Sequence, residues 1–338
     1  MSVIAAGRVR RRRRSLVVAV ALAVVIVALF LLTLSVGRSI TPLGEVLAVI
    51  TGQDVPGASF TVGRLRLPRA VTAVLVGLAL GLSGSLFQTM LRNPLASPDI
   101  IGISYGSSAA AVVAIALLGL GGPIVSVIAV VSGLAVAFAV YLLSYRGGIL
   151  GSRLVLIGIA VGMMLLAVID WVLTRADVYK ANEALRWLTG SLNSSFWDDV
   201  YPLAVAVAVL VPAALVLGRR LEVLQLGDDS STALGVPADG TRLFILIVAV
   251  GLTSVATAAA GPVAFVAFLS GPIAARLVPG RLPLVPAALV GAALVLAADF
   301  VGDRLLPISL PVGVITGAVG APYLLWLLAR SNRKGGRL

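Results

Sequence analysis

Long apolar runs recur from one end of this chain to the other, and they constrain its fold more than any other feature. A helix that crosses a bilayer needs about 20 mostly apolar residues, and the runs have about this length, with short polar connections between them. The chain is 59% hydrophobic and 12% charged, with a mean hydropathy of +1.09. These values predict one all-α polytopic membrane domain and leave no room for a soluble domain of appreciable size.

We expect about ten transmembrane helices. They are predicted at residues 15–36, 70–91, 100–120, 124–145, 154–173, 201–217, 243–260, 263–278, 284–301 and 312–329. The domain thus covers residues 15–329, between a basic N-terminal segment, 1–14, and a basic tail, 330–338. The first run is too long for a removable signal peptide and lacks a small-residue cleavage site.

The net charge of +12 is concentrated beside the apolar runs. Arg8 and residues 10–14 precede the first run, and Arg330, Arg333 and Lys334 follow the last one. Such clusters stay in the cytoplasm, and with ten spans most of the 26 basic residues fall on that side. We therefore expect both termini in the cytoplasm, lipid as the surrounding partner and no nucleic-acid partner.

Missing residue types exclude several kinds of chemistry. The chain has no cysteine and no histidine, which excludes disulfides, histidine-ligated haem and the usual zinc sites, and we expect no metal site. Neither of its two lysines, Lys180 and Lys334, lies in a GxxxxGK[ST] sequence, so no P-loop is present. We expect no catalytic residues on this chain, and any ATP hydrolysis must occur on another one.

The longest polar interruption in the C-terminal half is residues 224–242, LQLGDDSSTALGVPADGTR. Asp228 and Asp229 precede a segment, 230–234, that favours a short helix, and Gly235 supplies a stop with Pro237 just beyond. We interpret this segment as a short helix on the cytoplasmic face, presented to a partner protein. The alternative is an ordinary solvated loop between two spans.

Two other groups of residues are candidates for function. Arg64, Arg66 and Arg69 lie at the outer mouth of the second span, where they indicate an acidic partner outside or extend to the interface. The fifth span holds a second group: Gly158, Gly162, Met163, Met164 and Asp170. An acid within a span is a functional candidate, although one near the outer end can also reach the interface.

Several motifs together resemble the permease subunits of iron-siderophore, haem and cobalamin importers, the FecCD-type family of ABC transporters. They are RLPR at 66–69, RNPLASPDIIG at 92–102, LGDDSSTALGV at 226–236, AGPVAFVAFLSGPIAAR at 260–276 and LPVGVITGAVGAPYLLWLL at 310–328. They follow the family's order over nearly the whole chain. One departure is the Ser-Gly-Pro-Ile sequence at 270–273, where many members have Pro-His.

The resemblance implies a ten-helix subunit of type II importer architecture, with the translocation pathway between two permease subunits. Two ABC ATPase subunits, which carry ATP and magnesium, drive transport, and an extracytoplasmic binding protein delivers the substrate; no cofactor is expected on this chain. The family's coupling helix matches Asp228, Asp229, Ser230, Ser231, Leu234 and Gly235 within the loop 224–242. The arginines that receive the binding protein match Arg66 and Arg69, and Arg304 follows with a shift in register.

The substrate is expected to be a ferric siderophore. LGDDSSTALGV and the TGSLNSSFW stretch at 189–197 look closest to the ferric-enterobactin type of permease, which works as half of a heterodimer. This similarity suggests a second, non-identical permease chain, while a homodimer and a haem or cobalamin substrate stay open. The alanine-, valine- and arginine-rich composition is typical of a GC-rich bacterial genome, so we expect the bacterial inner membrane.

Two other classes of protein compete with this interpretation. A secondary transporter driven by an ion gradient needs ionisable groups deep in the membrane. The only acids within the predicted spans are Asp170 and Asp299, both towards the outer ends. A membrane-embedded enzyme needs a catalytic constellation, and no paired carboxylates converge at mid-membrane. Both alternatives are weaker than a permease.

Overall fold

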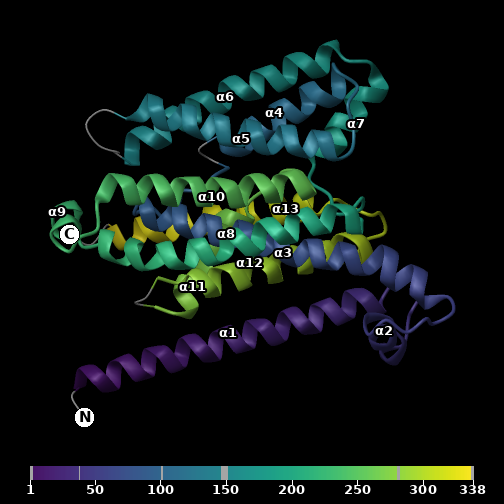
Figure 1. Ribbon diagram of the computed structural model, residues 1–338, viewed down its shortest axis with the longest axis horizontal. Helices are drawn as coiled ribbons and strands as arrows, with labels where there is room; N and C mark the ends of the chain where they lie inside the picture. The colour runs from purple at the N-terminus through teal and green to yellow at the C-terminus, as the bar shows by residue number, and fades with distance from the viewer. Residues whose placement is uncertain (1–2, 38, 100–101, 146–150, 280–281, 336–338) are drawn as a thin grey trace.

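The structure is a computed structural model that describes residues 3–335 except 38, 100–101, 146–150 and 280–281. Every regular element in this part is helical (Figure 1), as the sequence predicts. The elements are α1 (Val3–Ser35), α2 (Leu43–Ile50), the π-helix η1 (Ser59–Arg66), α3 (Leu67–Met90), α4 (Ile103–Ala116), α5 (Pro123–Ser144), α6 (Gly151–Arg175), α7 (Val178–Leu188), α8 (Trp197–Leu224), α9 (Asp228–Ala233), α10 (Ala238–Ala260), α11 (Val266–Leu277), α12 (Leu284–Phe300), the π-helix η2 (Val301–Leu305) and α13 (Val312–Gly335).

Seven helices in the described residues are long and apolar enough to cross a membrane. Three more apolar helices are shorter, at Ile103–Ala116, Val266–Leu277 and Val312–Leu327. The short helices α2 and α7 lie at one end of the bundle, here called the outer end, and α9 lies at the opposite, inner end (Figure 1).

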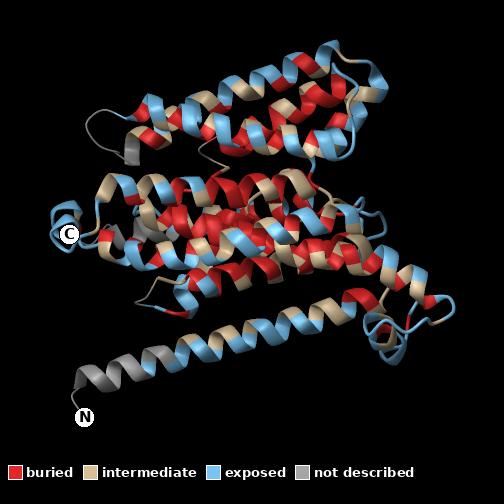
Figure 2. Cartoon of the chain, in the orientation of Figure 1, coloured by how far each residue is buried: buried red, intermediate tan, exposed pale blue. Residues whose placement is uncertain are grey.

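The central element is α3, which packs against α8, α10, α11 and α12 and is buried along most of its length (Figure 2). Its glycines Gly77, Gly81 and Gly84 form the close contacts that their spacing predicts. A Cβ at Gly77 or Gly81 would overlap the backbone of α12, and a Cβ at Gly84 would overlap the carbonyl oxygen of Ala267 in α11. In an apolar solvent, such small-residue contacts are a main source of helix association.

The helices α4, α5, α6 and α7 form a second layer beside the central bundle (Figure 1), with a buried apolar cluster of their own. This layer meets the central bundle mainly where α5 packs on α10. At that contact, Ser126 Oγ donates to the carbonyl of Ala258 at 2.9 Å. A Cβ at Gly133 would overlap Ser107 Oγ and lie 2.6 Å from Ser254 Oγ, so the absence of a side chain sets the distance between the layers.

The first helix lies along the outside of the bundle and packs mainly on α12 (Figure 1). Its apolar side chains are largely exposed, including Leu16 and Val24. Near its beginning, Arg14 Nε donates to the carbonyl of Leu277, the last residue of α11, at 3.0 Å. An exposed apolar surface of this kind is what lipid contact requires.

The second span begins earlier than predicted. The sequence predicts this span at residues 70–91, whereas η1 joins α3 in one continuous helix, Ser59–Met90. Pro68 lacks an N–H, and the Leu67 N–H bonds five residues back, to Val62. In the same pattern, an N–H at residue 68 would bond to the Gly63 carbonyl, but proline has none. The Gly63 carbonyl accepts a hydrogen bond from Trp197 Nε1 at 3.0 Å instead. A side chain from α8 thus supplies the donor that the proline lacks.

The eighth predicted span, 263–278, is shorter in the structure than predicted, because α11 runs only from Val266 to Leu277. Gly261 and Phe265 both have positive φ angles, of 68° and 63°, and this conformation is unusual for a bulky residue. The Phe265 side chain fills the space beside Gly320 of α13, where a Cβ would overlap it. Tertiary packing between α11 and α13 therefore accompanies the backbone break.

We expect Gly84→Ala to destabilise the fold. The added methyl group on α3 would overlap the Ala267 carbonyl of α11, and the backbones of these two packed helices cannot easily move apart. Overpacking in a tight core costs about 3 kcal/mol. The matched control is Gly44→Ala in α2, where nothing lies within 4 Å of the added atom. Thermal unfolding of both purified variants in detergent measures the difference, and equal melting temperatures would contradict the central position of α3.

Candidate functional site

Charged residues from four elements meet at the outer end of the bundle. They are Arg66 of η1, Arg69 of α3, Asp299 of α12, and Asp303 and Arg304 of η2. We call these five residues the outer Arg–Asp cluster. The close packing of α3 on α12 brings their outer ends, and therefore η1 and η2, side by side.

Arg69 is the ion-pairing centre of this cluster. Its Nε lies 2.9 Å from Asp299 Oδ2 and its Nη2 lies 2.8 Å from Asp299 Oδ1, a bidentate arrangement. Its third nitrogen, Nη1, is 3.1 Å from Asp303 Oδ1. Because the Asp299 side chain is only 3% exposed, its charge depends on this arginine for compensation.

Arg66 binds backbone instead of acids and is 6% exposed. Its Nη1 donates to the carbonyl of Leu34 at 2.8 Å and to Thr41 Oγ1 at 3.3 Å, and its Nη2 donates to the carbonyl of Ser39 at 2.9 Å. The last carbonyls of a helix have no partners within the helix, so this guanidinium satisfies the end of α1 and the turn that follows it.

Arg304 completes the cluster. It pairs with Asp303 and donates to the carbonyl of Val36. Its guanidinium and that of Arg66 both lie against Gly37, where a Cβ would overlap Arg66 and lie 2.5 Å from Arg304 Nη1. Within the cluster itself, the three arginines and two aspartates leave one net positive charge.

The structure thus brings together all three arginines that the sequence analysis assigned to docking, although it gives each of them internal partners. The docking role itself stays a prediction. Sequence reasoning missed Asp299 and Asp303 as their counter-ions. The signal was present, since both acids come at the end of the ninth predicted span, opposite the start of the second.

The predicted short helix in the loop 224–242 is confirmed, and it begins slightly earlier than expected, at Asp228. Gly235 follows it with φ 79°, which is the predicted stop. Ser231 is buried and its Oγ donates to the Asp228 carbonyl at 2.9 Å, while Arg242 pairs with the Asp228 carboxylate at 2.7 and 3.0 Å. The Ser231 bond lies within α9, whereas the Arg242 pair holds α9 against the start of α10.

Several other residues of this loop are exposed and available for contact with a partner. Asp229, Ser230 and Leu234 are exposed, and the Leu226 and Leu234 side chains are each 63% exposed. Two exposed leucines on a polar loop at the inner end provide an apolar surface for another protein. Their role in coupling stays a prediction.

The candidates in α6 divide into two groups. Gly158 and Gly162 are buried in the contact with the start of α4, where a Cβ at Gly102 would lie 2.6 Å from the Gly158 carbonyl oxygen and 3.0 Å from Gly162 Cα. Their immediate role is helix packing.

By contrast, Met163 and Met164 are 56% and 62% exposed, and Asp170 is also exposed, near the outer end of the helix. A place in a translocation pathway stays a prediction for all five α6 residues. Among the described residues, no group of three or more acidic, histidine or cysteine side chains could hold a metal ion.

Comparison with known proteins gives consistent matches over nearly the whole chain. The pattern of the FecCD transport family matches residues 24–330. The ferric enterobactin transport system permease protein FepG of Escherichia coli is 39% identical over 89% of this chain and 92% of its own length. The achromobactin transport system permease protein CbrC of Dickeya dadantii is 38% identical over 89% of this chain and 87% of its own.

The fold has a counterpart among solved structures. An inward-facing conformation of a putative metal-chelate type ABC transporter superposes with a TM-score of 0.83 at 26% identity. The superposition covers 92% of this chain and 98% of the other. The helix arrangement is therefore shared along essentially the full length.

We expect Asp299→Ala to lower the free energy of unfolding by about 3 kcal/mol, because it leaves Arg69 without its bidentate partner in a nearly closed site. Replacing both residues, as Arg69→Met with Asp299→Leu, removes both charges together and should recover part of the loss. The control is Asp198→Ala, at an exposed acid in the first turn of α8. Thermal melting of the unmodified protein and the three variants tests this prediction. Equal losses of stability for Asp299→Ala and Asp198→Ala would contradict it.

Proposed function

This chain belongs to the FecCD transport family, and on that premise we propose that it is the permease subunit of an ATP-driven importer of ferric siderophores. The observation that carries the proposal is the match to siderophore permeases over about nine tenths of the chain. A permease of ferric enterobactin and one of achromobactin stand among these relatives. A cobalamin import permease of Halobacterium salinarum, 35% identical over 88% of this chain, favours cobalamin as the second candidate substrate.

In this proposal the chain crosses the bacterial inner membrane ten times. The seven long helices and the three shorter apolar ones supply the ten crossings, and α2, α7 and α9 lie at the two surfaces. An even number of crossings leaves both termini on one side. The arginines in the first half of α1 and the basic residues in the last turns of α13 favour the cytoplasm for that side, and the inner end then faces the cytoplasm.

ATP and magnesium are then handled by two partner ATPase subunits. Closure of the ATPase pair on ATP moves α9, which Arg242 holds to α10 and which also packs against α8. The helices rock as rigid bodies, as is usual where connections are too short to rearrange on their own. A cavity between two permease subunits opens alternately to each side, and this chain performs no covalent chemistry.

A second permease chain completes the pathway in this proposal. Exposed apolar side chains on α6 and α13 support it, among them Met164, Trp171, Val319 and Leu325. The Fe(3+) dicitrate transport system of Escherichia coli has two different permease proteins, FecC and FecD, both similar to this chain. By analogy we propose a non-identical second chain.

The extracytoplasmic binding protein docks at the outer Arg–Asp cluster. The cluster carries one net positive charge, and its Arg69 and Arg304 side chains are 15% and 12% exposed. Acidic residues on the binding protein would meet this charge from outside. Arg66 has a structural part in this site, since its hydrogen bonds hold the end of α1 and the turn after it beside the cluster.

Two single substitutions should move the binding-protein affinity in opposite directions. Asp303→Asn adds one positive charge to the cluster and Arg304→Gln removes one, so we expect tighter and weaker binding respectively, each by about two- to fivefold at low salt. Arg186→Gln, an exposed cation on α7, is the control for charge in general. Titration of the purified binding protein against the complex in nanodiscs measures all three, and an unchanged affinity for both cluster variants would remove the docking assignment.

The function itself is tested by purifying the tagged chain from its native membrane and identifying the retained chains by intact mass. We expect an ATPase and a second permease, and the reconstituted complex should take up a ferric catecholate with ATP faster than cobalamin or haem. Replacing both Leu226 and Leu234 by alanine should abolish ATPase capture or uptake, whereas Gly240→Ala, with open space around it, should not. Absence of any ATPase after gentle solubilisation would overturn the proposal.

A further inference from the structure

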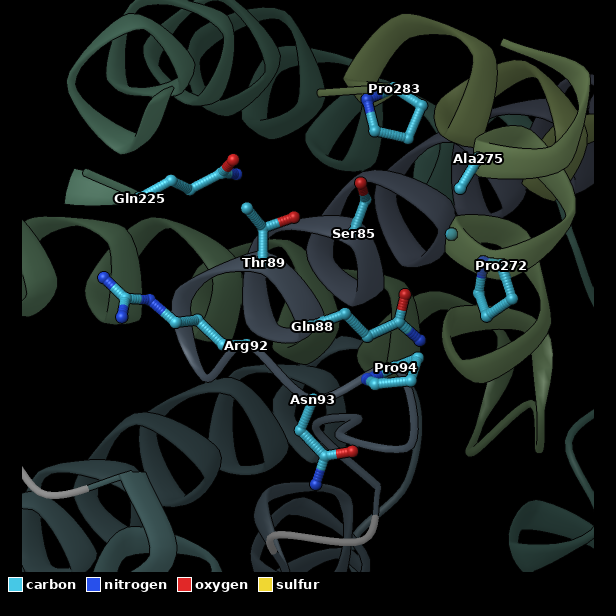
Figure 3. Close-up of a pocket in the computed structure, with 11 residues that line it drawn as sticks. Ser85, Gln88, Thr89, Arg92, Asn93, Pro94, Gln225, Pro272, Ala275 and Pro283 are labelled. Atoms are coloured by element: carbon cyan, nitrogen blue, oxygen red, sulfur yellow. The ribbon is translucent and has the colours of Figure 1, made fainter. Parts of the chain in front are cut away.

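A cavity of about 450 Å³ opens at the inner end of the bundle, close in sequence to the start of α9; Figure 3 shows the side chains that line it. It lies where the end of α3 meets the end of α8, the middle of α11 and the start of α12. Its polar lining consists of Ser85, Gln88, Thr89, Arg92, Asn93 and Gln225. Its size falls in the range of ligand-binding pockets.

The lining is polar, cationic and partly fixed in place. Gln88 Nε2 donates to the Phe268 carbonyl at 2.9 Å, and its Oε1 occupies the space that a side chain at Gly271 would fill. Arg92 supplies the only charge among the lining residues and forms no ion pair with any residue that the structure describes. The cavity is therefore suited to a group with negative charge.

The backbone at Arg92 is held in an unusual conformation. Arg92 follows the end of α3 with a φ of 49°, where glycine is the common residue and other side chains are strained. From this position Arg92 Nη2 donates to the Leu224 carbonyl at the end of α8 at 2.8 Å. The other guanidinium nitrogens have no partner among the described residues, and the side chain is exposed. The strained turn thus places a cation at the mouth of the cavity (Figure 3).

We propose that this cavity is a second contact site for the ATPase subunit and receives a carboxylate side chain from it, bound by Arg92. The inference rests on the proposed function. The ATPase is favoured over other occupants because the cavity is continuous with the predicted coupling surface: Gln225 lines the cavity three positions before the first residue of α9. Charge complementarity supplies the second argument, since the lining holds a cation and no acid.

This contact would give the ATPase a direct connection to the central helix. Arg92 follows the inner end of α3, and Arg69 lies in its first turn at the outer end. A helix of 24 residues is about 36 Å long. Movement of the ATPase at the cavity therefore reaches the outer Arg–Asp cluster through one rigid element, while α9 acts on α8 and α10.

The absence of cysteine from the chain allows a site-specific crosslinking test. In the assembled importer, Ala275→Cys places one thiol at an exposed position of the cavity lining, and Ser194→Cys places one at an exposed position of the outer end. After labelling with a maleimide photocrosslinker, we expect the first to capture the ATPase and the second not to. Capture of only the second permease chain, or of lipid, by the thiol at residue 275 would overturn the proposal.

Affinity measurements separate this site from α9. Arg92→Gln and the cavity-filling Ala275→Phe should each weaken capture of the purified ATPase about tenfold or more, and Arg13→Gln, which removes an exposed cation elsewhere, should not. If both cavity variants capture the ATPase as well as the unmodified chain does, while the Leu226 and Leu234 alanine variant does not, the cavity is not an ATPase contact site and the proposed function stands. If all variants bind normally, the α9 assignment fails as well. Stabilisation of the lone permease by inorganic phosphate, lost in Arg92→Gln, would instead identify a small-anion site and reject the docking.

Discussion

Backbone contact between α3 and its neighbours is the constraint on which the other features of this structure depend. Where the surroundings are as apolar as the protein interior, burial of apolar surface adds little to helix association, and close packing of small residues takes its place. Gly77 and Gly81 bring α3 against α12, and Gly84 brings it against α11. The positions of α8, α10 and, through α12, α1 follow from this central packing.

The same packing explains why charged groups gather where they do. At the outer end, α3 and α12 present Arg69 and Asp299 to each other, so the low exposure of this pair costs little once both charges are matched. Arg66 extends the arrangement to the end of α1 by bonding to its carbonyls. At the inner end the polar groups are less completely paired, and α9 and the Arg92 cavity both present groups to solvent. One end is therefore suited to stay fixed and the other to receive a moving partner.

A permease of this kind needs no reactive groups, and its function rests on the connection of two surfaces. In the proposed mechanism, ATP binding outside this chain is converted into helix movement by contacts at the inner end. Binding-protein docking at the outer end is then linked to the same movement through α3. The second layer, α4 to α7, is joined to the central bundle by close contact of the small residues around Gly133.

The sequence by itself determined the class of the protein, its helical content, the glycine contacts of α3 and the short helix that Gly235 ends. Each follows from local chemistry: run length, residue spacing or a glycine stop. The sequence could not determine that Arg66 is buried against carbonyls about 30 residues earlier, or that Gly158 and Gly162 pack against the start of α4. Nor did it predict that Trp197 supplies the donor missing at Pro68. These were decided by tertiary structure, because lipid and protein interior are equally apolar, and the pattern along a helix does not tell which face meets which.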